Sequence, residues 1–98
     1  MIYELLTEGK ENARTGKELA AHLGCDIRTI TEQIEKERRS GQPICANSRG
    51  DAPGYFLADN ADDLQDYCDR LKHRAIELFT TRQALIRVLK QLQDKQEV

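Results

Sequence analysis

A leucine at every seventh position is the strongest pattern in the sequence, and it fills the last third of the chain. The seam that it defines consists of Leu64, Cys68, Leu71, Ala75, Leu78, Arg82, Leu85, Leu89 and Leu92. Apolar side chains at alternating spacings of four and three residues are typical of a coiled coil or a helix bundle. Residues 59–63 supply a cap and the acidic first turn that suit the start of a helix. We therefore expect one long helix within residues 59–98.

This helix needs a partner outside its own chain. At about 1.5 Å per residue it extends for roughly 45 Å, which is more than a domain built from residues 1–58 covers. We therefore expect a homodimer. The residues expected at its interface are Leu64, Leu71, Leu78, Leu85, Leu89 and Leu92.

Two features of the long helix leave alternatives open. Arg82 occupies a seam position, and Phe79, Ile86 and Val88 widen the apolar face beyond the seam. Parallel pairs, antiparallel pairs and bundles all fit this pattern. The stretch Thr80-Thr81-Arg82-Gln83 also resembles an internal capping box. A break at that point is the alternative to the single helix that we favour.

Residues 1–40 carry the signals of three short helices. Ile2, Leu5 and Leu6 have helical spacing, and Gly9 ends this first helix. Thr15-Gly16-Lys17-Glu18 is a capping box that begins a second helix, which runs to Leu23. Gly24 suits its left-handed C-terminal turn.

The third helix follows this turn at once. Asp26 is its cap, Ile27, Ile30 and Ile34 form its apolar stripe, and Ser40-Gly41 stop it. Two helices separated by a three-residue turn that contains glycine form a helix-turn-helix arrangement.

A β-hairpin is expected after the third helix. Residues 44–46 and 55–57 are short strand candidates, and residues 47–54 have the composition of a turn. Since side chains alternate along a strand, Tyr55 and Leu57 should lie with Ile44, while Phe56 points to the C-terminal helix. The expected fold is thus mostly α with a small β-hairpin (α+β), divided into a domain of residues 1–58 and the helix of residues 59–98.

The order of these elements resembles a known family. The segments that carry the resemblance are Thr15 to Asp26 (TGKELAAHLGCD), Ile30 and Ile34, Gly41 to Ile44 (GQPI), and Gly54 to Leu57 (GYFL). They resemble the winged helix-turn-helix domains of bacterial and phage regulators, including the N-terminal domain of the biotin operon repressor. The resemblance covers about residues 1–58. Glu37 departs from it, because the family often has an apolar residue there, and the first helix is shorter than usual.

The resemblance implies that the protein binds double-stranded DNA through its third helix. The N-terminal residues of that helix then meet base edges in the major groove. With Ile30 and Ile34 in the core, the outward residues are Arg28, Thr29, Thr31, Glu32 and Gln33. Arginine pairs with guanine and glutamine with adenine. The alternative for Arg28 is an ion pair with Glu32 one turn along the helix.

Other basic residues are expected to contact phosphate. Arg14, Thr15 and Lys17 stand at the start of the second helix, where backbone N–H groups attract anions. Lys36, Arg38 and Arg39 form an expected phosphate-facing edge of the third helix. Arg49 lies at the tip of the expected wing, where it either enters the minor groove or is a solvated loop charge.

Other classes of site find no support in the sequence. Cys25, Cys45 and Cys68 are not closely paired, which indicates free thiols in a cytoplasmic protein, with Cys25 buried. We find no metal-ligand spacing, phosphate-binding loop or nucleophile motif. No run of residues reaches the length of a membrane span. We therefore expect no metal, no cofactor, no small-molecule ligand, no membrane contact and no enzymatic activity.

The charge balance keeps more than one function open. The chain has 15 Lys and Arg against 17 Asp and Glu, which opposes general coating of nucleic acid but permits a specific binder with basic groups on one face. The favoured reading is a transcriptional regulator. The alternatives are a protein-interaction module, supported by the acids Glu32, Glu35 and Glu37, and an accessory subunit for replication or recombination.

Overall fold

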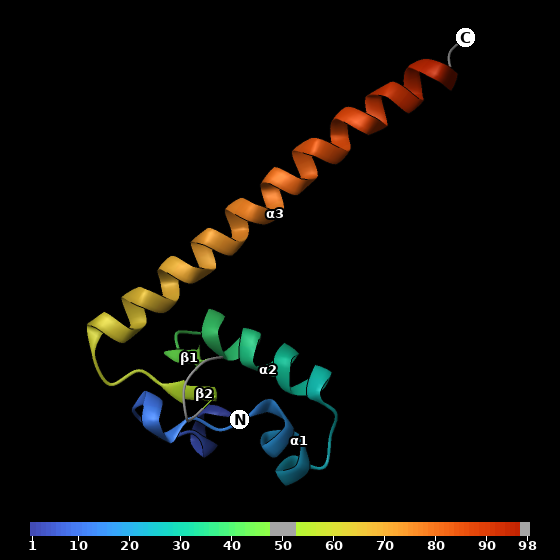
Figure 1. The fold of residues 1–98 in the computed structure, drawn as a ribbon. Helices are drawn as coiled ribbons and strands as arrows, with labels where there is room; N and C mark the ends of the chain where they lie inside the picture. The colour runs from blue at the N-terminus through green and yellow to red at the C-terminus, as the bar shows by residue number, and fades with distance from the viewer. Residues whose placement is uncertain (48–52, 97–98) are drawn as a thin grey trace. The chain divides into compact units, whose positions relative to one another are not determined.

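The computed structural model describes residues 1–47 and 53–96, and from Gly16 onward the helices and strands follow one another in the predicted order (Figure 1). In chain order they are the 3-10 helices η1 (Tyr3–Leu5) and η2 (Lys10–Asn12), the helices α1 (Gly16–Leu23) and α2 (Ile27–Arg39), the strands β1 (Ile44–Asn47) and β2 (Gly54–Leu57), and the helix α3 (Ala61–Gln96). The expected fold class is confirmed: the chain is mostly helical, with a two-stranded antiparallel hairpin and a long C-terminal helix.

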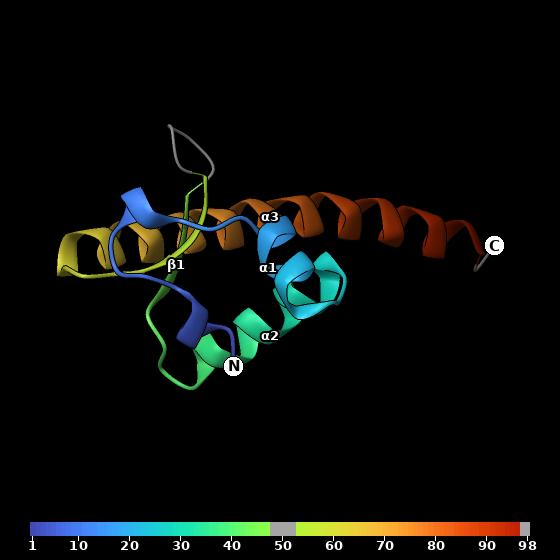
Figure 2. The same ribbon diagram turned by 90° about the horizontal axis from the view of Figure 1, so that it is seen from below.

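The caps around α1 and α2 form as predicted. Thr15 Oγ1 accepts the backbone N–H of Glu18 at 3.0 Å, and Asp26 Oδ1 accepts that of Thr29 at 2.8 Å. Gly24 ends α1 with a φ of 67°, a left-handed conformation that glycine adopts without strain. A three-residue turn therefore joins the two helices, and α1 packs against α2 next to it (Figure 2).

The predicted first helix is wrong in kind. Before Gly9 only the single 3-10 turn η1 forms, and Leu6 after it is extended. The reason is that the backbone finds partners along β2. Gly9 N donates to Leu57 O at 3.0 Å, Leu57 N donates to Thr7 O at 3.1 Å, and Tyr55 N donates to Arg14 O at 2.7 Å. The predicted burial still holds for Ile2 and Leu6, because both point into the core.

The two faces of the hairpin bury different partners. β1 and β2 are antiparallel, with Cys45 opposite Phe56. Tyr55 and Leu57 pack against the main core, which consists of Ile2, Leu6, Leu19, Ala20, Ile30, Ile34 and Ile44. Phe56 and Cys45 turn the other way and form a second cluster with Tyr67 of α3. The predicted alternation, with Phe56 meeting the C-terminal helix, is confirmed.

α3 is one unbroken helix. Asn60 caps it by accepting the N–H of Asp63 at 2.8 Å. Thr80 Oγ1 and Thr81 Oγ1 donate to carbonyl oxygens one turn earlier, those of Ile76 and Glu77. The threonines therefore do not cap a new helix, and the alternative of a break is wrong. The first turns of α3 belong to a compact unit of residues 1–67, and residues 68–98 form a second unit.

Within residues 1–47 and 53–96, no helix combines the length and the apolar character that crossing a membrane requires.

Candidate nucleic-acid interface

The outward face of α2 carries a row of charged side chains. Ile30 and Ile34, each 1% exposed, fix the inward face of the helix. Arg28, Glu32 and Lys36 follow one another at intervals of four residues on the opposite side, and all three are exposed. We call these three residues the outward row. Its position agrees with the prediction for a helix whose apolar stripe packs on the core.

Arg28 and Glu32 form the ion pair that the sequence offered as an alternative to base contact. Arg28 Nε lies 3.2 Å from Glu32 Oε1, with side chains 87% and 62% exposed. An exposed pair of this kind contributes about 0–1 kcal/mol, so a competing phosphate or guanine displaces Glu32 at little cost. Lys36 has no ion-pair partner within the part of the chain that the structure describes.

Two other residues that were predicted to contact bases are already hydrogen-bonded within the fold. Thr29 Oγ1 donates to Asp26 Oδ1 at 2.7 Å. This bond, together with the bond from the Thr29 backbone, lowers the pKa of Asp26 below its ordinary value. Gln33 is half-buried and not on the outward row, and its Nε2 donates to Glu37 at 2.9 Å. Contact between Gln33 and adenine would require this bond to open.

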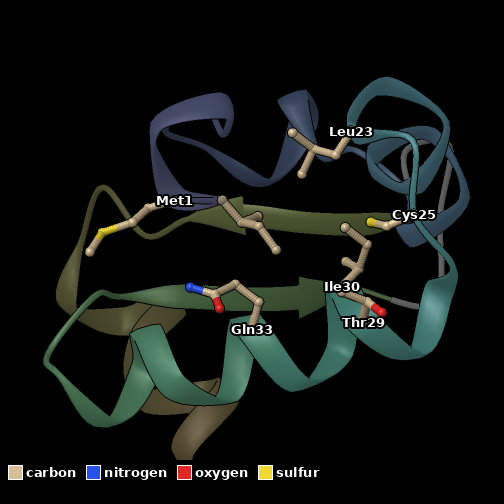
Figure 3. Close-up of a pocket in the computed structure, with 7 residues that line it drawn as sticks. Met1, Leu23, Cys25, Thr29, Ile30 and Gln33 are labelled. Carbon is tan, nitrogen blue, oxygen red and sulfur yellow. The ribbon is translucent and has the colours of Figure 1, made fainter.

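Thr29 and Gln33 also border a small open hollow of about 150 Å³ between α2, the end of α1 and the start of the chain (Figure 3). Its lining consists of Met1, Ile2, Leu23, Cys25, Thr29, Ile30 and Gln33. Most of these groups are apolar, and the hollow offers no charged side chain to a ligand. The Gln33 side chain borders this hollow, and the hollow gives no indication of a separate ligand site.

Two basic residues lie at the start of α1, one without an ion-pair partner among the described residues and one bonded within the fold. Lys17 is exposed, and the described residues place no acidic group within ion-pair distance of it. Arg14 is half-buried, and its Nη1 donates to Leu5 O at 3.4 Å while Nε lies 3.9 Å from Glu18. Its backbone also pairs with Tyr55. Lys17 thus remains available for phosphate, whereas Arg14 is part of the internal structure.

The expectation that Arg38 lies on a phosphate-facing edge is wrong. Its side chain is only 17% exposed. Nε donates to Ile44 O and Nη1 to Glu35 Oε1, both at 2.8 Å. The guanidinium also stacks 4.8 Å from the ring centre of Tyr67. The sequence held a signal for this position, because Arg38 continues the four-residue spacing of Ile30 and Ile34 and so tends inward.

Glu37, which stands where the resemblance would place an apolar residue, is buried. It is 3% exposed and accepts hydrogen bonds from Ile2 N at 2.8 Å, Tyr3 N at 2.7 Å and Gln33 Nε2. Burial favours the neutral acid, but these bonds outweigh burial and lower the pKa of Glu37. The carboxylate therefore ties α2 to η1. The Glu37 side chain lies in the interior and is not part of the outward row.

The remaining predicted sites are placed as follows. Arg49 lies outside the described residues. Cys25 is half-buried rather than buried as expected, Cys45 is buried and Cys68 is exposed, and no disulfide joins them in the described structure. Residues 1–47 and 53–96 contain no cluster of three or more groups able to hold a metal ion.

The predicted interface leucines of α3 are all exposed in the single chain. Leu64 and Leu71 are each 37% exposed, and Leu78 is 67% exposed. The rest of the row behaves in the same way, with exposed side chains at Leu85, Leu89 and Leu92. Large exposed apolar surfaces often mark sites of association, so these exposures are compatible with the predicted interface, which stays a prediction.

Compared with known proteins, the chain matches no protein-family model, no curated protein and no solved structure.

Proposed function

We propose that the protein is a sequence-specific DNA-binding regulator of the winged helix-turn-helix type, acting as a homodimer. The observation that carries the proposal is the geometry of residues 1–47 and 53–57. A helix, a three-residue turn, a second helix and a hairpin follow in order, and the second helix leaves its outward row in solvent. This arrangement suits insertion of α2 into a major groove.

The individual roles follow from the geometry of the side chains. Arg28 stands in the first turn of α2, where recognition helices meet base edges, and it exchanges Glu32 for the O6 and N7 atoms of a guanine. Lys36 contacts phosphate further along the helix. Lys17, in the first turn of α1, contacts phosphate with the support of the free N–H groups of that turn.

The test begins with selection of preferred sequences from a randomised duplex library, followed by anisotropy titrations of the selected duplex. Replacing Arg28 by Ala should reduce discrimination at one or two base pairs by about 1–3 kcal/mol. Arg87→Ala is the matched control, since Arg87 is an exposed arginine of α3 outside the compact unit of residues 1–67. Lys17→Ala should weaken binding to all sequences and reduce the salt slope by about one, and Lys90→Ala serves as its control.

The outcomes distinguish base-specific recognition from nonspecific electrostatic binding to DNA. Equal losses on every sequence from the Arg28 and Lys17 variants would contradict base reading by α2 and leave DNA binding intact. Failure of the wild-type protein to bind any duplex at low salt would contradict the whole proposal.

A protein-interaction module is the second candidate, and the charge of the first unit favours it. Residues 1–67 include eight Lys and Arg against thirteen Asp and Glu. Glu35 also stands on the solvent side of α2, 44% exposed, beside Arg39. A surface of mixed charge suits a protein partner as well as DNA. Absence of duplex binding at low salt is the result that this candidate expects.

An accessory subunit for replication or recombination would bind duplex DNA without selecting a sequence.

A further inference from the structure

The exposed seam of α3 is built from two unequal rows. One row consists of five leucines seven residues apart, from Leu64 to Leu92. The other row alternates with it and consists of Cys68, Ala75, Arg82 and Leu89. The first row is uniformly large, and the second contains two small residues and one cation. The unbroken course of α3 keeps both rows on one face.

A parallel dimer in register sets each row against itself. Ala75 then faces Ala75 of the second copy, and Cys68 faces Cys68, so two layers are underfilled between layers of paired leucines. Each underfilled layer costs stability because the facing side chains lose packing contacts. Arg82 also faces Arg82 of the second copy, which places two like charges side by side in an apolar layer.

An antiparallel dimer sets each row against the other. Cys68 and Ala75 then face leucines, so large and small side chains alternate across the seam and the layers have similar volumes. The two Arg82 side chains fall in different layers. Each lies against a leucine and extends its charged end from the edge of the seam into water.

The charges along α3 favour the same direction. The four residues Asp62, Asp63, Asp66 and Asp69 precede any base, and from Arg70 to Gln96 the helix has seven bases and two acids. The macrodipole accounts for acids in the first turn only. Reversal of one helix places acidic ends beside basic ends. This contribution is small, because the acids lie away from the seam and salt screens them.

We propose that the seam of α3 is covered by α3 of a second copy of this chain running in the opposite direction. The inference rests on the homodimer of the proposed function and adds its direction. The registers that set the unequal rows against each other differ by seven residues. The two that pair the greatest length of α3 place Cys68 opposite Leu85 or Leu92 of the second copy. At about 1.5 Å per residue, the two Cys68 residues are then roughly 26 Å or 36 Å apart along the coil.

Cysteine cross-linking of the full chain tests the direction. Sedimentation equilibrium first establishes that the wild-type protein is a dimer. Leu85→Cys and Leu92→Cys are then oxidised separately, and the disulfides are mapped by mass spectrometry of the digested protein. We expect a disulfide between Cys68 and the new cysteine of the other copy in one of the two variants. Arg87→Cys, on the side of the helix away from the seam, is the control and should not cross-link.

A second measurement leaves the seam unaltered except for a label. Cys25 is replaced by Ala, and Cys68 is spin-labelled while Cys45 stays buried at 0% exposure. Paired helices lie about 8–10 Å apart, so a parallel dimer gives a short distance between the labels. The antiparallel dimer gives the long separation derived above.

Each result has one meaning. Disulfides between the two Cys68 residues, or a short distance between labels, would overturn the antiparallel direction while leaving the homodimer in place. A wild-type protein that sediments as a monomer would overturn the homodimer itself. A long label distance supports the proposal even where neither new cysteine cross-links.

Discussion

Exchange of Glu37 for Gln probes how α2 holds the start of the chain. The Glu37 carboxylate accepts the backbone N–H groups of Ile2 and Tyr3 at 2.8 and 2.7 Å, and the side-chain amide of Gln33 at 2.9 Å. Glutamine has the same shape but only one acceptor oxygen. Its NH₂ group then faces a donor, and the backbone N–H of either Ile2 or Tyr3 loses its partner.

The size of the effect follows from this geometry. A hydrogen bond to a charged group contributes about 1.5–3 kcal/mol, and a buried donor without a partner costs about 1–3 kcal/mol. We expect Glu37→Gln to lower the free energy of unfolding by about 2–3 kcal/mol. Glu32→Gln is the matched control on the same helix. Glu32 is 62% exposed and pairs with an exposed Arg28, so its replacement should change stability by no more than about 0.5 kcal/mol.

The pH dependence gives the prediction a second dimension. Burial raises the pKa of Glu37, but the bonds from Ile2, Tyr3 and Gln33, together with the positive charge at the start of the chain, bring it below its ordinary value. A carboxyl group with a lower pKa in the folded state stabilises the fold above its unfolded-state pKa of about 4.3, and this contribution is lost as the pH falls through the folded-state pKa. The difference between wild type and Glu37→Gln should therefore be full at neutral pH and shrink in acid.

Urea unfolding followed by circular dichroism measures these differences. The titrations are made near pH 7 and pH 3 at one protein concentration, because association changes apparent stability. Equal stability of the Glu37 and Glu32 variants near pH 7 would refute the anchoring role of the carboxylate. A gap between wild type and Glu37→Gln that persists undiminished near pH 3 would refute the electrostatic part of the argument.

Three further predictions concern other parts of the chain. Gly54→Ala should destabilise the protein by about 2 kcal/mol or more, because Gly54 has a φ of 129° and a Cβ there would meet the backbone of Arg14. Gly41→Ala, also at positive φ but in open space, should cost only about 1 kcal/mol in the same unfolding assay. Tyr67→Ala should lower the free energy of unfolding by about 3 kcal/mol, since it removes one of the three buried side chains of the second cluster. Leu78→Asp should sediment as a monomer at micromolar concentration, while its hairpin and short helices remain folded. Persistence of the dimer would contradict the proposed interface along the seam.

The sequence predicted what local interactions decide. Thr15, Gly24 and Asp26 act within four residues of their own positions, and the helices that they bound appear where expected. The misplaced features depend on distant partners. The Glu37 carboxylate accepts a hydrogen bond from Ile2, which lies 35 positions earlier. No local sequence pattern shows that this contact holds the start of the chain where a longer helix was predicted.

Arg38 shows the same limit at the candidate interface. A basic residue near the end of a recognition helix suggests phosphate contact when only its neighbours are considered. In the structure its guanidinium serves Ile44 O, Glu35 and the ring of Tyr67 at once. These partners come from β1, α2 and α3, so the spacing of Arg38 from Ile30 and Ile34 could show that it tends inward but not which groups it binds.

The charge of the first unit makes dimerisation central to the proposed function. In the proposed complex each copy would offer few bases to DNA, chiefly Lys17, Lys36 and Arg28 once it leaves Glu32, because Arg14 and Arg38 are engaged inside the fold. Each phosphate contact adds to affinity through the counterion that it releases, so a single copy with so few contacts should bind weakly. A second copy on the same coil makes the second contact intramolecular, which raises affinity by orders of magnitude without any new base. Under the proposed function, an acidic chain would bind DNA tightly at paired half-sites and still release it elsewhere. The seam of α3 would then contribute to the choice of DNA sites together with the outward row of α2.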